Sequence, residues 1–422
     1  MSLAQSPPMD ASLTALAGDR RAFQRLPGLK GAPAAFRAGL RVIARNWVLG
    51  TIVFVTPGGR ELRIAGSAAG PNVRLVIRDF RFMRRVLATG DIGFAEGYMA
   101  GEWDTPNLAD LLSAFAANWN RLQRVTMGNP LAWTVNRIRH ALRPNSRSGA
   151  RRNIHAHYDL GNAFYGQWLD PTMTYSSARF DPPGLSLPAA QAAKYQALAK
   201  GMDLRAGHSV LEIGCGWGGF AEFAAREVGA KVTAITISDE QYAFAKQRIF
   251  DAGLNDRAEI RLVDYRDVEG RFDRVASIEM FEAVGERYWP AYFGKVSQAL
   301  APGGRAGLQI ITIRDETFEE YRGRADFIQK YIFPGGMLPS EERLRRVTEK
   351  SGLAWTNVER FGRDYAATLA EWHRRFDAAW EDIHELGFDE RFRKLWKFYL
   401  SYCEAGFRTE RTNVVQLSLA KA

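Results

Sequence analysis

The sequence is poor in cysteine and has no long apolar segment. Its two cysteines, Cys215 and Cys403, provide neither a disulfide framework nor a metal-ligand spacing, so we expect no metal site. The strongest apolar run, residues 47–55, is far shorter than the roughly 20 residues of a membrane-spanning helix. The N-terminus lacks the charged-then-apolar order of a signal peptide. These absences predict a cytoplasmic protein, soluble or peripheral to the inner face of a membrane.

Acidic residues are fewer than basic ones, 47 against 57, which gives a net charge of +10. Such a balance indicates an anionic partner: nucleic acid, an anionic membrane surface or an acidic substrate. No recognition-helix, zinc or RNP-type pattern accompanies the charge, which argues against nucleic acid. The length of 422 residues and the 46% hydrophobic content allow two or three domains with sizeable cores.

Composition and hydrophobic spacing divide the chain into four segments. Residues 1–30 are rich in Ala, Pro, Gly and Arg, and we expect them to be mobile. Residues 31–120 combine period-two alternation with helical spacing, which predicts a small α+β domain. Residues 121–153 form an arginine-rich linker suited to an anionic bilayer, although a solvated linker without function has the same composition. Residues 154–422 form the larger domain.

Strands and helices alternate in the larger domain, which predicts a doubly wound α/β sheet, mostly parallel. We predict strands at residues 209–213, 231–238, 258–265, 272–281, 305–313 and 413–421. The terminal strand is expected to be antiparallel, at one edge of the sheet. The aromatic-rich residues 154–182 are interpreted as a lid over the site, and residues from about 314 to 410 as a helical insertion.

Glycine is concentrated directly after the first strand of this sheet, in the sequence EIGCGWGG. Gly214, Gly216 and Gly218 would let the backbone approach a nucleotide-type ligand closely. Glu212, at the end of the strand, would repel a pyrophosphate but tolerates a cationic ligand such as S-adenosylmethionine. A NAD site and a purely structural turn are the alternatives. In either case Cys215 is interpreted as a small packing residue.

Six further motifs follow one another in a specific order: HYDLGNAFYGQWLDPTMTYSSARF, AITISDEQYAFAKQR, SIEMFEAVG, KYIFPGGMLPS, FGRDYAATLAEW and AGFRTERTNVVQLSLAK. Together with the glycine turn, they make residues 150–422 resemble the cyclopropane-fatty-acyl-phospholipid synthase family, which includes the mycolic acid methyltransferases. The stretch GDIGFAEGYMAGEWD resembles the accessory domain of the bacterial phospholipid-modifying members. The resemblance implies a class I methyltransferase sheet with a smaller lipid-facing N-terminal domain.

The resemblance also implies an activity, which is transfer of the methyl group of S-adenosylmethionine to the double bond of an unsaturated phospholipid acyl chain. A cyclopropane fatty acid is the default product, and a methyl-branched or methylated unsaturated chain is the rival. A methyltransferase acting on a small amine and a non-catalytic lipid-binding protein remain open as alternatives. A homodimer is compatible with the sequence, but nothing in it requires one.

The resemblance places the cofactor against four parts of the chain. These are the lid, the glycine turn with Glu212, the end of the second strand and the end of the third. The residues expected to bind it are Tyr175, Ser176, Glu212, Gly214, Gly216, Gly218, Thr236, Gln241, Asp264, Tyr265 and Arg266. For Asp264 in particular, an ordinary turn cap is the alternative interpretation.

The family uses a bound bicarbonate as the base, held by Glu, Tyr, His and Cys side chains and by backbone. By resemblance, Glu282 and Tyr365 are the Glu and the Tyr. Methyl attack leaves a carbocation on the chain, and among the many aromatic side chains we select Tyr175 and Tyr365 to stabilise it. The sequence departs from the pattern at Ser177, where the family has Cys, and at Ile311, where it has His.

These departures leave two hypotheses for the base, because a serine can still bind an anion and an isoleucine side chain cannot. In the first, bicarbonate occupies an altered cage that includes Ser177, with Gln309 or Thr312 as a further partner. In the second, Glu282 is itself the base.

Overall fold

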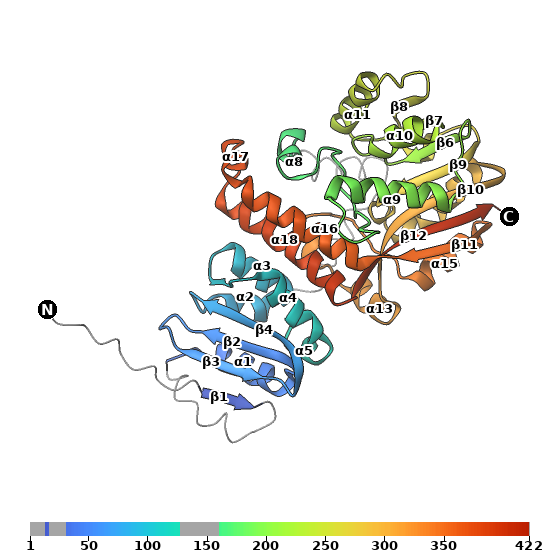
Figure 1. The fold of residues 1–422 in the computed structure, drawn as a ribbon. Helices are drawn as coiled ribbons and strands as arrows, with labels where there is room; N and C mark the ends of the chain where they lie inside the picture. Colours follow the sequence, from blue (N-terminus) through green and yellow to red (C-terminus); the bar gives the residue numbers. More distant parts are fainter. Residues whose placement is uncertain (1–12, 17–30, 127–159, 422) are drawn as a thin grey trace. The chain divides into compact units, whose positions relative to one another are not determined.

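The computed structural model describes residues 13–16, 31–126 and 160–421 of the chain. Most of the expected basic linker and the start of the expected lid lie outside these residues. The chain forms two compact units, residues 1–132 and 133–422, each built on one sheet (Figure 1). No helix in these described segments is long and apolar enough to cross a bilayer.

The first unit contains a five-stranded sheet in the order β1-β3-β2-β4-β5. Its strands are β1 (Leu13–Leu16), β2 (Leu49–Val55), β3 (Glu61–Ala65), β4 (Ala68–Ile77) and β5 (Trp103–Asp104). Its described helices are α1 (Ala34–Asn46), α2 (Phe82–Thr89), α3 (Asp91–Met99), α4 (Leu108–Ala117) and α5 (Trp119–Thr126). β2 and β3 form an antiparallel hairpin, as the turn signal between them indicates. β1 was not predicted: it pairs parallel with β3 from within residues 1–30.

The stretch GDIGFAEGYMAGEWD forms α3 and the turn into β5, and its side chains pack the interior of the first unit. A Cβ on Gly93 would lie 2.0 Å from the carbonyl oxygen of Arg85, so only glycine lets α3 approach α2 this closely. The buried Glu102 accepts a hydrogen bond from Arg85 Nε at 3.0 Å, and Trp103 stacks on Phe94. These contacts give the motif a structural role, and its lipid-facing role stays a prediction.

The second unit contains a seven-stranded sheet in the order β11-β12-β10-β9-β6-β7-β8. Its strands are β6 (Ser209–Ile213), β7 (Lys231–Thr236), β8 (Ala258–Leu262), β9 (Phe272–Ile278), β10 (Leu300–Ile313), β11 (Leu353–Arg360) and β12 (Thr412–Lys421). Strands β6 to β10 are mutually parallel. β12 is antiparallel to both of its neighbours. The expected doubly wound, mostly parallel sheet with an antiparallel terminal strand is therefore confirmed.

The terminal strand does not lie at the edge of the sheet, and that expectation was wrong. β12 lies between β10 and β11. The physical reason is visible in its burial pattern, because six consecutive residues, 414–419, are buried on both faces. A strand of this kind needs a neighbour on each side, whereas the half-exposed β11 suits the edge.

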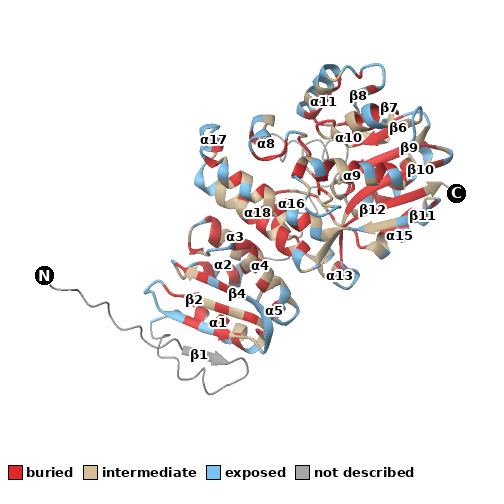
Figure 2. Cartoon of the chain, in the orientation of Figure 1, coloured by how far each residue is buried: buried red, intermediate tan, exposed pale blue. Residues whose placement is uncertain are grey.

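Helices cover both faces of this sheet, and buried residues concentrate on the strands and on the helix sides that face them (Figure 2). The described helices before β10 are α8 (Asn162–Trp168), α9 (Leu187–Gly201), α10 (Gly219–Phe223), α11 (Asp239–Asp251) and α12 (Trp289–Ala299). Those after it are α13 (Asp315–Gly323), α14 (Phe327–Tyr331), α15 (Glu341–Lys350), α16 (Gly362–Ala378), α17 (Trp380–Glu385) and α18 (Glu390–Arg408).

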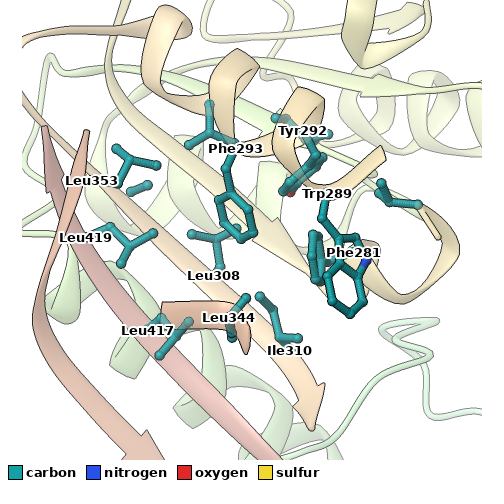
Figure 3. Packing of buried hydrophobic residues seen from close by; sticks show 14 of the residues in the cluster. Phe281, Trp289, Tyr292, Phe293, Leu308, Ile310, Leu344, Leu353, Leu417 and Leu419 are labelled. Atoms are coloured by element: carbon teal, nitrogen blue, oxygen red, sulfur yellow. The ribbon is translucent and has the colours of Figure 1, made fainter. Parts of the chain in front are cut away.

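One core cluster packs aromatic side chains of α12 and of the turn after β9 against β10 and β12. Figure 3 shows Phe281, Trp289 and Phe293 on one side of this cluster and Leu308 and Leu417 on the other. A second cluster joins α9, α10 and α11 to the other face of the sheet. The two cores hold rigidly the strand ends from which the site is built.

Candidate functional site

The carboxyl ends of β6 and β9 lie side by side at the point where the strand order of the sheet reverses. Ligands of doubly wound sheets bind outside the strand ends at this point. Gly214, Gly216 and Gly218 follow β6 and all have positive φ, at 82°, 53° and 83°. A Cβ on Gly214 would lie 2.6 Å from Met280 Cγ, whereas a Cβ on Gly216 would meet no atom within 4 Å. The middle of the turn is therefore open to a ligand.

Glu212 is buried beside this turn and has an unpaired oxygen. Its side chain is on the face of β6 that packs on α9 and α10, and its Oε2 has no hydrogen-bond partner in the described part of the chain. Burial raises the pKa of Glu212 to about 8, against the opposing charges of Arg248 and Lys194. A positively charged ligand would stabilise the ionised form. The orphaned carboxylate oxygen and the open Gly216 fit S-adenosylmethionine, whose sulfonium is cationic.

Thr236 and Gln241, predicted to bind the cofactor, are brought together at the end of β7. Thr236 Oγ1 donates to Gln241 Oε1 at 2.9 Å. Ser238 caps α11, because its Oγ accepts from the Gln241 N–H. Trp217 of the glycine turn donates to Asn162 of α8 at 2.7 Å, which ties the described part of the expected lid to the turn.

The structure accounts for Asp264 through ordinary turn chemistry. Asp264 caps the short 3-10 helix 265–267, and both of its oxygens accept hydrogen bonds from the Arg266 guanidinium, at 2.8 and 2.6 Å. Tyr265 packs edge-on against Tyr292 of the core. Contact of Asp264, Tyr265 and Arg266 with the cofactor stays a prediction.

The expected lid residues Tyr175 and Ser176 are held from two sides. The hydroxyls of Tyr175 and Tyr399 share a hydrogen bond of 2.6 Å, and the Tyr175 ring lies against Trp372 of α16. Ser176 Oγ accepts from Lys194 Nζ at 2.7 Å. Lys194 was missed by the sequence analysis, because a lysine in a helix is usually solvated.

Glu279, which the sequence analysis did not select, accepts hydrogen bonds from three groups of the site. Its Oε1 accepts from the Ser177 N–H at 2.8 Å and from Gln309 Nε2 at 2.7 Å. Its Oε2 accepts from the Tyr365 hydroxyl at 2.6 Å. Tyr365, expected to act beside Glu282, is therefore bonded to Glu279. Burial raises the pKa of Glu279, and the Tyr365 hydrogen bond and the charge of Lys194 oppose that rise.

Glu282 lies one turn further along the chain, in the 3-10 helix 281–283. Its Oε1 accepts from the backbone N–H of Ile311 at 2.6 Å, and its Oε2 has no hydrogen-bond partner among the described residues. Burial, and next the charge of Glu279, raise the pKa of Glu282 to about 8. Ile311, where the family has His, thus contributes to the site through its backbone.

Gln309 contributes its side chain to the site, whereas Ser177 contributes its backbone N–H and not the side chain that the sequence suggested. The Ser177 hydroxyl donates to the carbonyl of Ala178 at 2.9 Å, so its backbone N–H, not its side chain, contacts the acid. Gln309 lies on the Glu279 side of β10. Thr312 is three residues further along the strand and belongs to the opposite face, so of the two predicted helpers only Gln309 reaches the acid.

Two signals in the sequence could have revealed the missed residues. The predicted strand 272–281 contains an acid within an apolar run, and a buried acid is a functional candidate. That strand ends instead at Ile278, and Glu279 has a φ of +48°, which turns its side chain toward Tyr365. For Lys194 the signal is weaker, and it is only the position of the lysine on the apolar face of α9, between Gln191 and Tyr195.

Comparisons with known proteins identify relatives that cover most of the chain. A family model for mycolic acid cyclopropane synthetase matches residues 145–417. A tuberculostearic acid methyltransferase of Mycobacterium tuberculosis is 41% identical over 371 residues, 85% of this chain and 86% of that protein. A cyclopropane-fatty-acyl-phospholipid synthase of Escherichia coli is 35% identical over 367 residues, 85% and 90% of the two chains. A solved mycolic acid cyclopropane synthase, complexed with SAH and CTAB, has a TM-score of 0.61 at 29% identity and covers 64% of this chain and 98% of its own.

Proposed function

Because the chain belongs to the mycolic acid cyclopropane synthetase family, we propose that it methylates the double bond of an unsaturated fatty acyl chain in a phospholipid. The chain is an S-adenosylmethionine-dependent methyltransferase of a family that modifies fatty acids and lipids. When bound, S-adenosylmethionine supplies an electrophilic methyl group on a sulfonium.

One observation carries the proposal: the glycine turn lies against the segment that contains the two buried acids, Glu279 and Glu282. Met280, between Glu279 and Glu282 in the chain, lies against Gly214, and Ser277 Oγ donates to the carbonyl of Ile213 at 2.9 Å. A donor bound at the turn would therefore present its methyl group next to buried acids. A base is needed when an alkene is methylated, because the chain cation that results must lose a proton, and a carboxylate can accept it.

We infer that the product is an open methylated chain and not a ring. The relative named for tuberculostearic acid methylation is more similar to this chain than the Escherichia coli cyclopropane synthase, 41% against 35% over nearly equal lengths. The two family positions that depart, Ser177 and Ile311, both belong to the site that would hold the base. Cyclopropane formation is the second candidate, and the Escherichia coli relative supports it.

Lipid analysis of a bacterial host that makes cis-unsaturated phospholipids tests the reaction. We expect expression of this protein to add the mass of one methylene to unsaturated acyl chains, with vinylic proton signals retained in the NMR spectrum. High-field ring protons would favour the cyclopropane, and unchanged acyl masses would contradict the proposed function.

We propose further that the enzyme acts at an anionic membrane surface. The net charge of +10 supports this, because each basic side chain near such a surface contributes about 1 kcal/mol of binding. On vesicles of an unsaturated phosphatidylglycerol the rate should exceed that on matched phosphatidylcholine vesicles, and it should fall as salt shortens the screening length. Equal rates on the two vesicles at every salt concentration would contradict an electrostatic role.

A further inference from the structure

We propose that the carboxylate of Glu279 occupies the place of the bicarbonate expected from the family, and that Glu279 is the base that takes the proton from the methylated chain. This inference rests on the proposed function. It departs from both sequence-based hypotheses, which assigned the base to bicarbonate in an altered cage or to Glu282.

The donors that an added anion would need are already used by Glu279. Tyr365 has one O–H and donates it to Glu279 Oε2, and Ser177 has one backbone N–H and donates it to Oε1. The amide of Gln309 has two N–H groups, and it contacts Glu279 Oε1 at 2.7 Å and the Ser177 carbonyl at 3.3 Å. These three groups come from the segment before α9, from β10 and from α16. They form a cage for one carboxylate, and none of the three groups has a donor left for bicarbonate.

The remaining groups around Glu279 would also disfavour bicarbonate. The backbone N–H of Ile311 donates to Glu282, so it is not available to a further anion. The side chain of Ile311 has no donor. An added anion would lie near two buried carboxyl groups, Glu279 and Glu282, and like charges repel strongly where water is excluded.

The backbone of Glu279 supports a functional role for its side chain. Its φ of +48° is in the left-handed region, which is unfavourable for residues with a Cβ and is usually occupied by glycine. Its own N–H donates to the carbonyl of Gln309 at 2.8 Å, which fixes this conformation. Strained backbone conformations of this kind cluster at active sites. A glutamate at this position keeps the carboxylate in the cage.

The surroundings of Glu279 suit a base. A carboxylate whose pKa lies above its ordinary value binds a proton more tightly, and burial has this effect on Glu279. Lys194 and the three donors stabilise the ionised form that must be present before reaction. Lys194 is itself buried, which lowers its pKa to about 7, and the nearby Glu279, Asp170 and Glu212 oppose that shift.

The proposed step balances without any further reactant. The alkene gives its π electron pair to the methyl carbon, whose bond to sulfur breaks with the pair left on sulfur. The neighbouring chain carbon becomes a cation. An adjacent C–H bond then gives its pair to a new double bond, or, if the added methyl loses the proton, to a ring. The proton passes to an oxygen of Glu279, which becomes a neutral carboxylic acid and later releases the proton to water.

Bicarbonate depletion tests this assignment directly. The full-length enzyme is assayed with S-adenosylmethionine and unsaturated phospholipid vesicles, in buffer freed of carbon dioxide and then with bicarbonate added back. We expect the wild-type rate to change by less than twofold. A loss of tenfold or more that added bicarbonate restores would overturn the inference while leaving the proposed function intact. Absence of methylated lipid under both conditions would contradict the proposed function, and this inference with it.

Two variants complete the test. Glu279→Gly removes the carboxylate and relaxes the backbone, and we expect a rate loss of about 100-fold or more, the usual contribution of proton transfer. Added bicarbonate or formate should recover part of this loss by filling the emptied cage. Glu279→Gln keeps the shape of the side chain, so it should lose as much activity without being rescued. A rate within twofold of wild type for either variant would overturn the inference.

Glu410→Gly is the matched control, because Glu410 also has a positive φ, +56°, but is exposed at the end of α18. It should retain wild-type activity with and without bicarbonate. Calorimetric titration with S-adenosylmethionine, which does not depend on turnover, should show unchanged affinity in every variant. This readout separates loss of the base from loss of folding.

Discussion

Gly216→Ala should weaken the binding of S-adenosylmethionine by roughly 10- to 100-fold. The added methyl group would project into the open centre of the turn, where no protein atom lies within 4 Å, and so into the space assigned to the ligand. Overpacking a closely fitted site costs about 1–3 kcal/mol, and each 1.4 kcal/mol is tenfold in affinity. Isothermal titration calorimetry measures the effect directly.

Gly253→Ala is the control for the backbone cost of this substitution. Gly253 also has a positive φ, +67°, and open space around its Cβ position, but it lies in the loop after α11. In each variant, an alanine in the left-handed region should lower the free energy of unfolding by about 1–2 kcal/mol. Both variants should therefore unfold at a temperature a few degrees lower. Equal affinity of the two variants for S-adenosylmethionine would contradict the placement of the cofactor at the turn.

Tyr365→Phe should lower kcat by about 10- to 100-fold and leave the affinity for S-adenosylmethionine unchanged. The substitution removes the O–H that donates to Glu279 Oε2 at 2.6 Å, and a hydrogen bond to a charged group contributes about 1.5–3 kcal/mol. Tyr365 acts on Glu279 and is in this account a positioning residue. The effect should therefore appear in kcat, with little change in KM for the lipid.

Tyr292→Phe provides the comparison, since Tyr292 is also a buried tyrosine but lies on α12 in the core cluster and is not one of the three groups that donate to Glu279. It should keep kcat within about threefold of wild type. If Tyr365→Phe raises KM and spares kcat, then Tyr365 binds substrate and does not position the base.

Much of the second unit could be predicted, because its elements are determined by local patterns. The apolar runs of β6 and β7 and the glycines after β6 identify the sheet and the ligand-binding turn without tertiary information. Glu282 and Tyr365 were selected through family motifs. The structure places both within one cluster, although Tyr365 contacts a different acid.

The rest depended on tertiary contacts that local patterns do not encode. The apolar run from residue 272 to 281 continues through Glu279, so the end of β9 and the positive φ were not visible in it. Lys194 is buried and donates to Ser176 of a separate segment, and the sequence of α9 alone does not encode this contact. β12 was placed at the edge because the pairing of β11 could not be known from its own sequence.

Methylation with a donor whose methyl group carries three deuterium atoms tests the central claim most directly. Purified enzyme and unsaturated phospholipid vesicles are incubated with this donor, and the released acyl chains are analysed by mass spectrometry. The account predicts label on an acyl carbon of the former double bond, with all three deuterium atoms retained, because Glu279 takes its proton from the chain. Retention of only two would show that the proton came from the added methyl group, and high-field ring protons in the NMR spectrum of the same product would then identify ring closure. Label in the headgroup, or no label in lipid, would contradict the account as a whole.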